Sequence, residues 1–500
     1  MPQGHSLDAW GKRLRLPKGD FNDFSKFTQE MLTYCIQDVN VTTTLFLRLT
    51  ERMRKRGYSE RSCKLEHDIR VVVDEQQRNG FAFDKIGADL LQRRLVRNRS
   101  GIEGPIRDLF PRTLERQGTY NYRTKQDGTP YASYLRHLDQ FPRIEFEPSG
   151  DQYHTLDWVE FNIGSPQQRV KKLLSLGWEP QQFTPKGNPK VDEESLLDFA
   201  EKSKRPEVGA IAEWLVLSGR ISMLQTWLDN LGPDGRIHGE VFTCGAGNRR
   251  MTHAQPNTAN IPKAKEKVPY GKECRQLWTV ADTSKRRLVG YDAAGLEMRC
   301  FAHYLNNPKA SELYTKGDPH RVNAELLGID RDPVKNVFYA FIYGAANEKL
   351  GWTGNTSLVS KREKQKFGKF IREQLVTKTP GLKELVEEIQ AEGEWIRTID
   401  GGFVRCFSDH ARINYKLSSA GAIAMKQASI FIRDRIREKG YDALKVGDIH
   451  DEGQFDCELG CAHEVGKLCV QALRDAGEEL GFRVPLDGEY KVGNNWAETH

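Results

Sequence analysis

The second half of the chain mixes strand-like and helix-like segments, and this mixture limits the fold more than any other feature. Leu288–Asp292 is a short apolar run typical of a buried strand, and Gly295–Leu305 after it has helical periodicity. Lys445–Glu458 has the pattern of two short strands around a turn near Asp451. Strands that alternate with helices and hairpins in this way predict an α+β fold with mostly antiparallel sheet.

The length and composition predict a multidomain, intracellular protein. At roughly 150 residues per domain, 500 residues correspond to about three domains. The chain contains no apolar run approaching the ~20 residues of a membrane-spanning helix. Its nine cysteines are scattered, which indicates a reducing compartment rather than a disulfide framework. The 75 Lys and Arg against 69 Asp and Glu give a net charge of +6, which permits a polyanionic partner without demonstrating one.

Two acidic positions are candidates for metal binding. Asp292 ends the predicted strand, where its carboxylate can point into a cleft, although an aspartate there more often caps the following helix. Asp451 and Glu452 follow His450 at the predicted turn, where adjacent acidic residues are usually solvated. Hard divalent cations need carboxylate oxygens held on rigid elements. Asp292 and Asp451 are 159 residues apart in the sequence, so only the tertiary fold could bring them into one site.

A predicted helix over residues 330–349 carries cations and aromatic rings together. Pro333 lies in its first turn, where the missing N–H breaks no intrahelical hydrogen bond. One helical face holds Arg331, Lys335, Phe338, Tyr339 and Ile342, with Tyr343 at its edge. Such a face suits a nucleoside triphosphate, and it equally suits a core helix whose cations reach solvent. The helix alone leaves both interpretations open.

In chain order, these segments resemble motifs A, B and C of the family A DNA polymerases. They are YDAAGLEMRCFAHYL from Tyr291, RDPVKNVFYAFIYGAA from Arg331 and VGDIHDEGQFDC from Val446. GNRRMTHAQPNTANIP, residues 247–262, resembles the template-primer segment of the same family. Almost the whole chain is similar to the replicative DNA polymerases of short-tailed bacteriophages. The resemblance implies a right-hand fold of thumb, palm and fingers that performs two-metal nucleotidyl transfer.

The resemblance assigns a catalytic metal site to three residues. Asp292, Asp451 and the carbonyl of Ala293 would hold two Mg²⁺ ions, for which Mn²⁺ can substitute. One ion would lower the pKa of the primer 3′-hydroxyl, and the other would neutralise the triphosphate and the leaving pyrophosphate. Arg331 and Lys335 complete the implied catalytic set by gripping the β- and γ-phosphates.

The resemblance also assigns contacts to the nucleotide and to DNA. His320 would assist at the phosphates, and Tyr339 would stack near the incoming sugar and base. Glu297 matches the family's steric gate, which excludes a ribose 2′-hydroxyl, and Tyr343 would lie beside the templating base. The implied contacts to primer-template DNA are Arg250, His253, Asn257, Asn414, His450, Glu452 and Gln454.

Two positions depart from the family pattern. Ser418 replaces the glutamine of the family's Asn-x-x-x-Gln contact, which begins here at Asn414. Serine cannot reach as far, so minor-groove checking by that residue is in doubt. Gly402 stands where the family usually has arginine, which removes one expected backbone contact.

The N-terminal end resembles only part of a 3′–5′ exonuclease domain. HSLDAWGKRL, residues 5–14, is similar to a segment well inside that domain, and Tyr34 and Asp38 match its third motif, Tyr-x-x-x-Asp. The motifs that supply the other metal-binding carboxylates have no counterpart in this sequence. We therefore expect residues 1–58 to be a truncated, ribonuclease H-like exonuclease remnant without proofreading of its own. The missing half is then either lost or supplied by a separate polypeptide.

The rest of the chain is predicted to form a thumb region at 59–228 and a palm at 229–500, with fingers inserted at about 309–420. Between about 109 and 160 the apolar pattern dissolves among Tyr, Gly, Pro and Arg residues, which predicts an irregular loop. In the resembled polymerases an insertion here captures host thioredoxin. The segment is a candidate dock for thioredoxin or another processivity factor, with a solvated loop as the alternative.

Together these features predict a monomeric DNA-directed DNA polymerase of phage-type DNA replication, encoded by a virus and acting in the cytoplasm of its host. It would bind primer-template DNA and deoxynucleoside triphosphates, and no membrane. A single-subunit RNA polymerase is the nearest alternative, because it shares a lysine followed eight residues later by Tyr-Gly, as at Lys335 and Tyr343. Glu297 and Glu452 argue against it. A non-catalytic primer-template binding protein is disfavoured because both candidate metal-binding aspartates are present.

Overall fold

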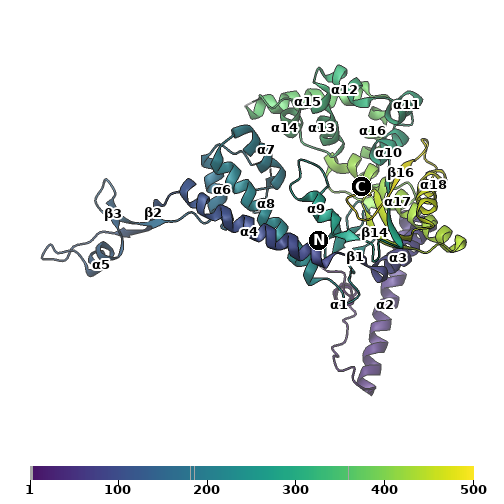
Figure 1. Ribbon diagram of the computed structural model, residues 1–500, viewed down its shortest axis with the longest axis horizontal. Coiled ribbons are helices and arrows are strands. Elements are labelled where there is room, and N and C mark those ends of the chain that lie inside the picture. Colours follow the sequence, from purple (N-terminus) through teal and green to yellow (C-terminus); the bar gives the residue numbers. More distant parts are fainter. Residues whose placement is uncertain (1–3, 181, 185, 359) are drawn as a thin grey trace. The chain divides into compact units, whose positions relative to one another are not determined.

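The chain folds into two compact units. The computed structural model describes residues 4–180, 182–184, 186–358 and 360–500. The first unit comprises Met1–Ala82, His238–Ile261 and Thr279–His500. The second comprises Phe83–Ile237 and Pro262–Trp278. Helices and small sheets occur in both units (Figure 1), which confirms the predicted α+β class.

Four antiparallel strands form the central sheet of the first unit. They lie in the order β14, β15, β11 and β16. Their bounds in that order are Ala443–Ile449, Glu452–Glu458, Arg286–Ala293 and Gly488–Gly493. In β11, Asp292 lies opposite Glu452 of β15 and Glu489 of β16. The predicted strand and the predicted hairpin are both present, and this sheet is antiparallel as expected.

Helices cover the sheet, and its two central strands, β11 and β15, are therefore almost continuously buried. The helices are α3 (Glu60–Asn79), α10 (Leu296–Leu305), α17 (Arg412–Lys439) and α18 (Ala462–Glu479). Figure 1 shows α3, α17 and α18 beside the sheet strands. Val289 of β11, Phe455 of β15 and Leu473 of α18 belong to one apolar core. Burial of each such side chain contributes roughly 1.5–3 kcal/mol, so this core holds the ends of β11 and β15 firmly in place.

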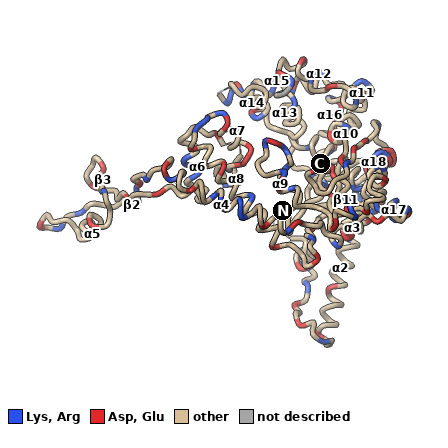
Figure 2. Tube along the Cα trace, in the orientation of Figure 1, with Lys and Arg blue, Asp and Glu red and all other residues tan. Residues whose placement is uncertain are grey.

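Six further helices and a hairpin also belong to the first unit. The helices are α11 (Pro308–Lys316), α12 (Pro319–Leu327), α13 (Arg331–Ile342), α14 (Asn347–Gly354), α15 (Lys361–Lys378) and α16 (Leu382–Glu392). The hairpin pairs β12 (Trp395–Arg397) with β13 (Phe403–Arg405). Lys and Arg are interspersed with Asp and Glu along the chain (Figure 2). Individual cations near the site therefore matter more than the small net charge.

The helix predicted over 330–349 is shorter than expected. Helix α13 ends at Ile342, and α14 begins only at Asn347. Gly344 has a φ of +75°, and a Cβ built on it would lie 2.0 Å from the carbonyl oxygen of His410. The chain therefore turns where only glycine fits, and the prediction of one continuous helix was wrong beyond Ile342.

The second unit is built around four helices. They are α4 (Lys85–Leu109), α6 (Pro166–Ser175), α7 (Glu193–Ser203) and α8 (Pro206–Asp229). Ser165 caps α6 by accepting a hydrogen bond from the Gln168 N–H, and Pro166 occupies the first turn. The Gln168 side chain does not close a capping box. Its Oε1 accepts from the N–H of Asn162 instead.

The segment at 109–160 is ordered, which corrects the prediction of an irregular loop. Strands β2 (Thr113–Asn121), β3 (Arg143–Phe146) and β4 (Gln152–Val159) form an antiparallel sheet, with α5 (Ala132–Gln140) between β2 and β3. Most residues of β2 are exposed, and its register shifts between Arg116 and Gly118. An exposed strand with a bulge has no alternating apolar pattern, so the sequence carried no strand signal here.

The N-terminal end forms two helices, α1 (Leu7–Leu14) and α2 (Gln29–Arg56). Tyr34 and Asp38, the predicted exonuclease remnant, both lie on α2, and Lys18 reaches Asp38 at 3.6 Å. Much of the apolar surface of α2 and of the residues just before it is exposed, at Phe24, Phe27, Leu32, Ile36, Val39, Phe46, Leu47 and Leu49. Among the described residues, no helix is long and apolar enough to span a membrane.

Candidate active site

The end of β11 and the β14–β15 turn bring the two candidate aspartates together. The backbone N–H of Ala293 donates a 2.9 Å hydrogen bond to the carbonyl oxygen of Asp451. His450 has a φ of +60°, which turns the chain sharply between the two strands. Asp292 is partly buried and Asp451 is exposed at the turn. Two residues that are far apart in the sequence thus meet at adjacent strand ends.

The electrostatics of Asp292 suit a divalent cation. Burial, then the nearby carboxylates of Asp451 and Glu452, raise the pKa of Asp292 to about 7. A bound cation would relieve this crowding of like charges. The described residues contain no group of three or more His, Cys, Asp or Glu side chains arranged to hold a metal. A cation here would need further oxygen ligands from a backbone carbonyl, water or substrate, which is the usual situation of Mg²⁺ at phosphate-transfer sites.

A cleft of about 210 Å³ opens beside Asp451. The residues that line it are Arg250, Leu296, Glu297, Cys300, Tyr343, Leu417, Ser418, Gly421, Ala422, His450 and Asp451. Within it, the Tyr343 hydroxyl donates a 2.9 Å hydrogen bond to Oε2 of Glu297. Burial raises the pKa of Glu297, although this hydrogen bond opposes the rise. Glu297 is therefore held in one orientation at the wall of the cleft.

Helix α13 presents rings and cations near this cleft. The rings of Tyr339 and Tyr343 lie 6.2 Å apart at an interplanar angle of 24°, and His320 of α12 lies 6.2 Å from Tyr339. Lys335 is exposed on the same helix. Arg331 donates a 3.0 Å hydrogen bond to Asp318. Burial, then the charges of Lys335 and Arg331, lower the pKa of His320, and the charge of Asp318 opposes this, so His320 lies within electrostatic reach of the cations of α13.

The C-terminal tail contacts two of the predicted DNA-binding residues. Oε1 of Glu452 accepts hydrogen bonds from the indole N–H of Trp496 and from Gln454, and Oε2 lies 2.7 Å from Nδ1 of His500. Oε1 of Gln454 accepts from the Thr499 hydroxyl at 2.9 Å. Glu452 and Gln454 are both buried. Sequence reasoning missed Trp496, Thr499 and His500, because nothing local marks a tail that folds back onto a hairpin.

The segment at 247–262 supplies three other predicted DNA contacts. Strands β8 (Glu240–Phe242) and β9 (Thr252–Ala254) pair around a loop that carries Arg250 to the cleft. His253 is buried, and its Nδ1 lies 3.0 Å from the Thr258 hydroxyl. Asn257 is exposed, and its Oδ1 accepts from the N–H of Ala259. Arg250 and Asn257 are thus placed where a ligand can reach them, whereas His253 points inward.

His253 and His303 are expected to make the fold sensitive to acid. Burial lowers the pKa of both imidazoles from 6.5 to about 4. Between these values the unfolded chain binds more protons than the folded chain, so stability falls as the pH drops from about 6.5 to about 4. We expect each histidine to contribute on the order of 1–3 kcal/mol to this loss, measured by urea unfolding at pH 7 and pH 5.

His303→Gln separates this effect from general acid unfolding. His303 lies on α10, where its Nδ1 accepts a 3.1 Å hydrogen bond from the Arg483 N–H. Glutamine cannot titrate, so the variant should lose less stability between pH 7 and pH 5 than the wild type does. An unchanged pH dependence would contradict the assignment.

The two departures from the family pattern have clear structural settings. Asn414 lies in the first turn of α17, and Ser418 one turn later is buried at the cleft. No hydrogen-bond partner of the Ser418 hydroxyl is found among the described residues. A Cβ built on Gly402 would lie 3.0 Å from the Nη1 atom of Arg249. The space beside Gly402 is thus filled by an arginine from another segment.

An antiparallel sheet with two aspartates at adjacent strand ends, beside a helix of cations and tyrosines, defines a nucleotidyltransferase of the polymerase type. The family model for DNA polymerase family A matches residues 134–498. The chain therefore belongs to DNA polymerase family A and is a DNA-directed DNA polymerase. This result decides against the RNA polymerase alternative.

Individual relatives agree with this assignment. The DNA-directed DNA polymerase of Enterobacteria phage T3 is 31% identical over 99% of this chain and 83% of its own length. That of Escherichia phage T7 is 30% identical over the same shares. The POL domain of Pol1 from M. smegmatis, solved in complex with DNA primer-template and dNTP, has the same fold. Its TM-score is 0.73 at 18% identity, covering 99% of this chain and 79% of that one.

Proposed function

We propose that this polymerase adds deoxynucleotides to a primer 3′-hydroxyl at the junction of β11 and the β14–β15 turn. The observation that carries the proposal is the meeting of Asp292 and Asp451 there, through the hydrogen bond from the Ala293 N–H to the Asp451 carbonyl. Asp292 lies near the end of a central strand of the sheet, and Asp451 lies in the adjoining turn, where it lines the cleft. Such an arrangement suits in-line displacement at a phosphate.

Asp292, Asp451 and the Ala293 carbonyl would hold two Mg²⁺ ions, or Mn²⁺ in their place. When bound, the ions supply Lewis-acid activation of the primer hydroxyl and neutralise charge on the phosphates. The fit rests on the charge interaction between the two carboxylates, which together with burial raises the pKa of Asp292. Asp292 must lose its proton before it can bind a cation, so cation binding should release a proton near neutral pH.

The nucleotide would lie between helix α13 and the cleft. Lys335 and Arg331 would bind its β- and γ-phosphates, with His320 assisting. The ring of Tyr339 would stack near the sugar and base. Glu297 would block a ribose 2′-hydroxyl, because its carboxylate is held at the cleft wall.

Primer-template DNA would contact the residues that surround the cleft. Tyr343 would lie beside the templating base, and the DNA contacts would be Arg250, Asn257, Asn414 and His450, with His253, Glu452 and Gln454 acting from buried positions. Glu452 and Gln454 are buried by the tail, so they would act mainly by shaping the hairpin under the primer terminus. The fold shared with a polymerase solved on primer-template and dNTP supports this assignment.

Three further proposals concern the remaining segments. The sheet at 109–160 would bind thioredoxin or another processivity factor, supported by its exposed Tyr120, Tyr131 and Trp158. Residues 1–58 would belong to an exonuclease-like domain, in which Tyr34 and Asp38 form the third motif. The protein would act as a monomer in the cytoplasm of a phage host; its similarity to polymerases of phages T3 and T7 supports the phage origin.

Primer extension tests the proposed function directly. A labelled primer-template with Mg²⁺ and four deoxynucleotides should be extended by the purified chain, and ribonucleotides should not be used. Extension with ribonucleotides at a similar rate would contradict the assignment of Glu297 as steric gate. No extension by a folded chain that binds DNA would contradict the proposal that this chain alone carries a complete active site.

A further inference from the structure

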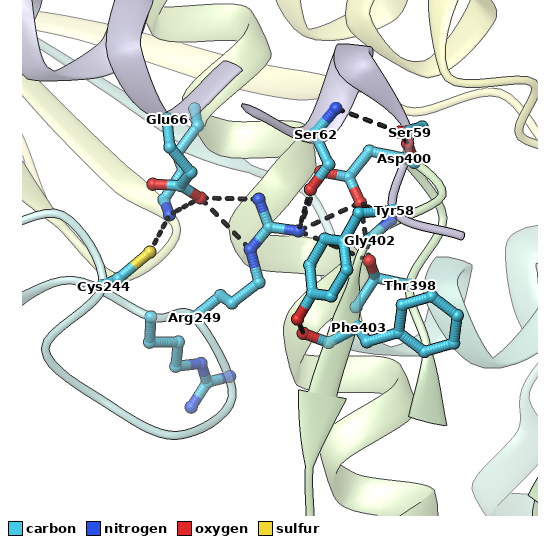
Figure 3. A network of polar contacts seen from close by, with 12 residues as sticks. Tyr58, Ser59, Ser62, Glu66, Cys244, Arg249, Thr398, Asp400, Gly402 and Phe403 are labelled. Carbon is cyan, nitrogen blue, oxygen red and sulfur yellow. Dashed lines mark hydrogen bonds and ion pairs between the residues drawn. The ribbon is translucent and has the colours of Figure 1, made fainter. Parts of the chain in front are cut away.

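Arg249 lies in the loop between β8 and β9, next to the cleft residue Arg250, and its side chain is buried (Figure 3). Its Nε and Nη2 donate to Oε1 of Glu66 on α3, at 3.1 and 2.6 Å. Its Nη1 donates to both carboxylate oxygens of Asp400, at 3.0 and 2.8 Å. Asp400 lies in the turn between β12 and β13. One guanidinium therefore joins the loop to a helix and to a hairpin.

The charges of this network are balanced. Lys426 of α17 is fully buried, and its Nζ donates a 2.6 Å hydrogen bond to Glu66. The two cations face two carboxylates, and their attraction keeps the pKa of both Glu66 and Asp400 below the usual range in spite of burial. Removal of one cation would leave a buried carboxylate without compensation, which is costly. The network is thus held in one arrangement.

The hydroxyl groups around Asp400 tighten this arrangement further. Thr398 donates a 2.6 Å hydrogen bond to Oδ1 of Asp400, and the Gly402 N–H donates to the same oxygen at 3.1 Å. Nη1 of Arg249 also donates to the Ser62 hydroxyl at 3.1 Å. A side chain at position 402 would compete for this space, since a Cβ there would lie 2.2 Å from the Ser62 hydroxyl oxygen.

The backbone of the loop depends on this anchor. Arg249 has a φ of +65°, in the left-handed region that residues other than glycine rarely adopt. Its N–H donates to the Ala246 carbonyl at 3.0 Å, and the Ala246 N–H donates to the Arg250 carbonyl at 3.2 Å. Such a conformation persists only where surrounding contacts determine it. The hydrogen bonds from the Arg249 guanidinium to Glu66 and Asp400 are the side-chain contacts that can hold this residue in its conformation.

Arg250 follows directly and lines the cleft with Glu297, Tyr343 and Asp451. Burial raises the pKa of both Glu297 and Tyr343, and the positive charge of Arg250 opposes that rise, which places its guanidinium in electrostatic reach of these side chains. The neighbouring arginines therefore have opposite environments. One is buried in a closed ion-pair network, and the other faces the cleft.

We infer that Arg249 is a positioning residue for DNA binding: its buried network holds the β8–β9 loop so that Arg250 contacts primer-template DNA. The inference rests on the proposed function, because it needs Arg250 to be a DNA contact. It assigns to Arg249 no contact with DNA of its own. Its effect on DNA affinity should therefore pass entirely through Arg250.

A double-mutant cycle on DNA affinity tests this inference. Arg249→Ala, Arg250→Ala and the double variant are compared with wild type by the fluorescence anisotropy of a labelled primer-template without nucleotide. We expect each single variant to bind about tenfold more weakly, the loss typical of one charge-assisted hydrogen bond. The double variant should bind as Arg250→Ala does, because Arg249 then has nothing left to position.

Two additional variants guard against a trivial loss of folding. Arg286→Ala removes another partly buried arginine from ion pairs with Asp442 and Asp456, at the far end of β11. It should lower the unfolding temperature without weakening DNA binding. If Arg249→Ala does not fold, Arg249→Lys takes its place in the cycle, since one ammonium group keeps the charge but cannot bridge Glu66 and Asp400 together.

Each outcome decides the inference. A double variant weakened by the product of the two single losses would mean that Arg249 acts independently, and would overturn it. So would an Arg249 variant with unchanged affinity. An Arg250→Ala variant with unchanged affinity would remove the proposed DNA contact and the inference with it. The proposed catalytic function would be tested independently, by comparing primer extension by the wild type with that by Asp451→Ala.

Discussion

Replacement of Asp451 with alanine is expected to slow primer extension by at least about a thousandfold. A carboxylate that holds catalytic cations supplies several kcal/mol of transition-state stabilisation, and about 4 kcal/mol corresponds to that factor. The fold should survive, because Asp451 is exposed and only its backbone oxygen accepts the Ala293 hydrogen bond. The measurement is single-turnover extension of a labelled primer at saturating DNA and deoxynucleotide.

Asp442→Ala is the matched control for this variant. Asp442 precedes β14 at the other end of the same hairpin and pairs with Arg286 at 2.8 Å. Its removal should leave extension close to the wild-type rate. An Asp451→Ala enzyme that extends primers within about tenfold of wild type would show that the reaction does not need this carboxylate. Loss of the Asp451 charge should also lower the pKa of Asp292, since Asp451 is one cause of its rise.

Glu297→Ala is expected to reduce discrimination against ribonucleotides by about a hundredfold, the scale on which a shaped pocket rejects one small group. The Glu297 carboxylate is partly buried and is fixed by the Tyr343 hydroxyl, so it forms a stiff wall rather than a mobile side chain. Alanine would leave space for a 2′-hydroxyl. The measurement is the ratio of kcat/KM for a deoxynucleotide to that for the matching ribonucleotide.

Tyr343→Phe tests how much the hydrogen bond from Tyr343 to Glu297 contributes to discrimination against ribonucleotides. Phenylalanine keeps the ring but removes the hydrogen bond to Glu297, so discrimination should fall by less than in Glu297→Ala. Glu312→Ala removes an exposed carboxylate on α11 and should change nothing. Unchanged discrimination in Glu297→Ala would reject the steric-gate assignment, even if the enzyme remained fully active.

The sequence predicted the strand and the hairpin turn that carry the candidate site, because their signals are local. Asp292 ends an apolar run and Asp451 occupies a turn between two short strands, and both patterns are visible within about ten residues. The cations and rings of α13 follow from helical spacing alone. The order of the three motifs along the chain then indicated the family, and with it the site.

Contacts between segments that are far apart in the sequence could not be predicted in this way. The contacts of Trp496 and His500 with Glu452 join segments that are more than forty residues apart. The network of Arg249 joins four elements, and no pattern around it distinguishes a buried arginine from an exposed one. The sheet at 109–160 could not be predicted for a different reason. Strand β2 is mostly exposed, so its sequence lacks the alternation of apolar and polar residues that indicates a strand.

The fold-back of the tail has a practical consequence for the preparation of this enzyme. His500 is in contact with Glu452, the first residue after the hairpin turn that carries His450. An affinity tag or fluorescent protein fused behind His500 would begin at that contact and would compete with the tail for its place. Recombinant protein for the assays above should therefore carry its tag in front of Met1, and a cleavable linker behind His500 should be avoided.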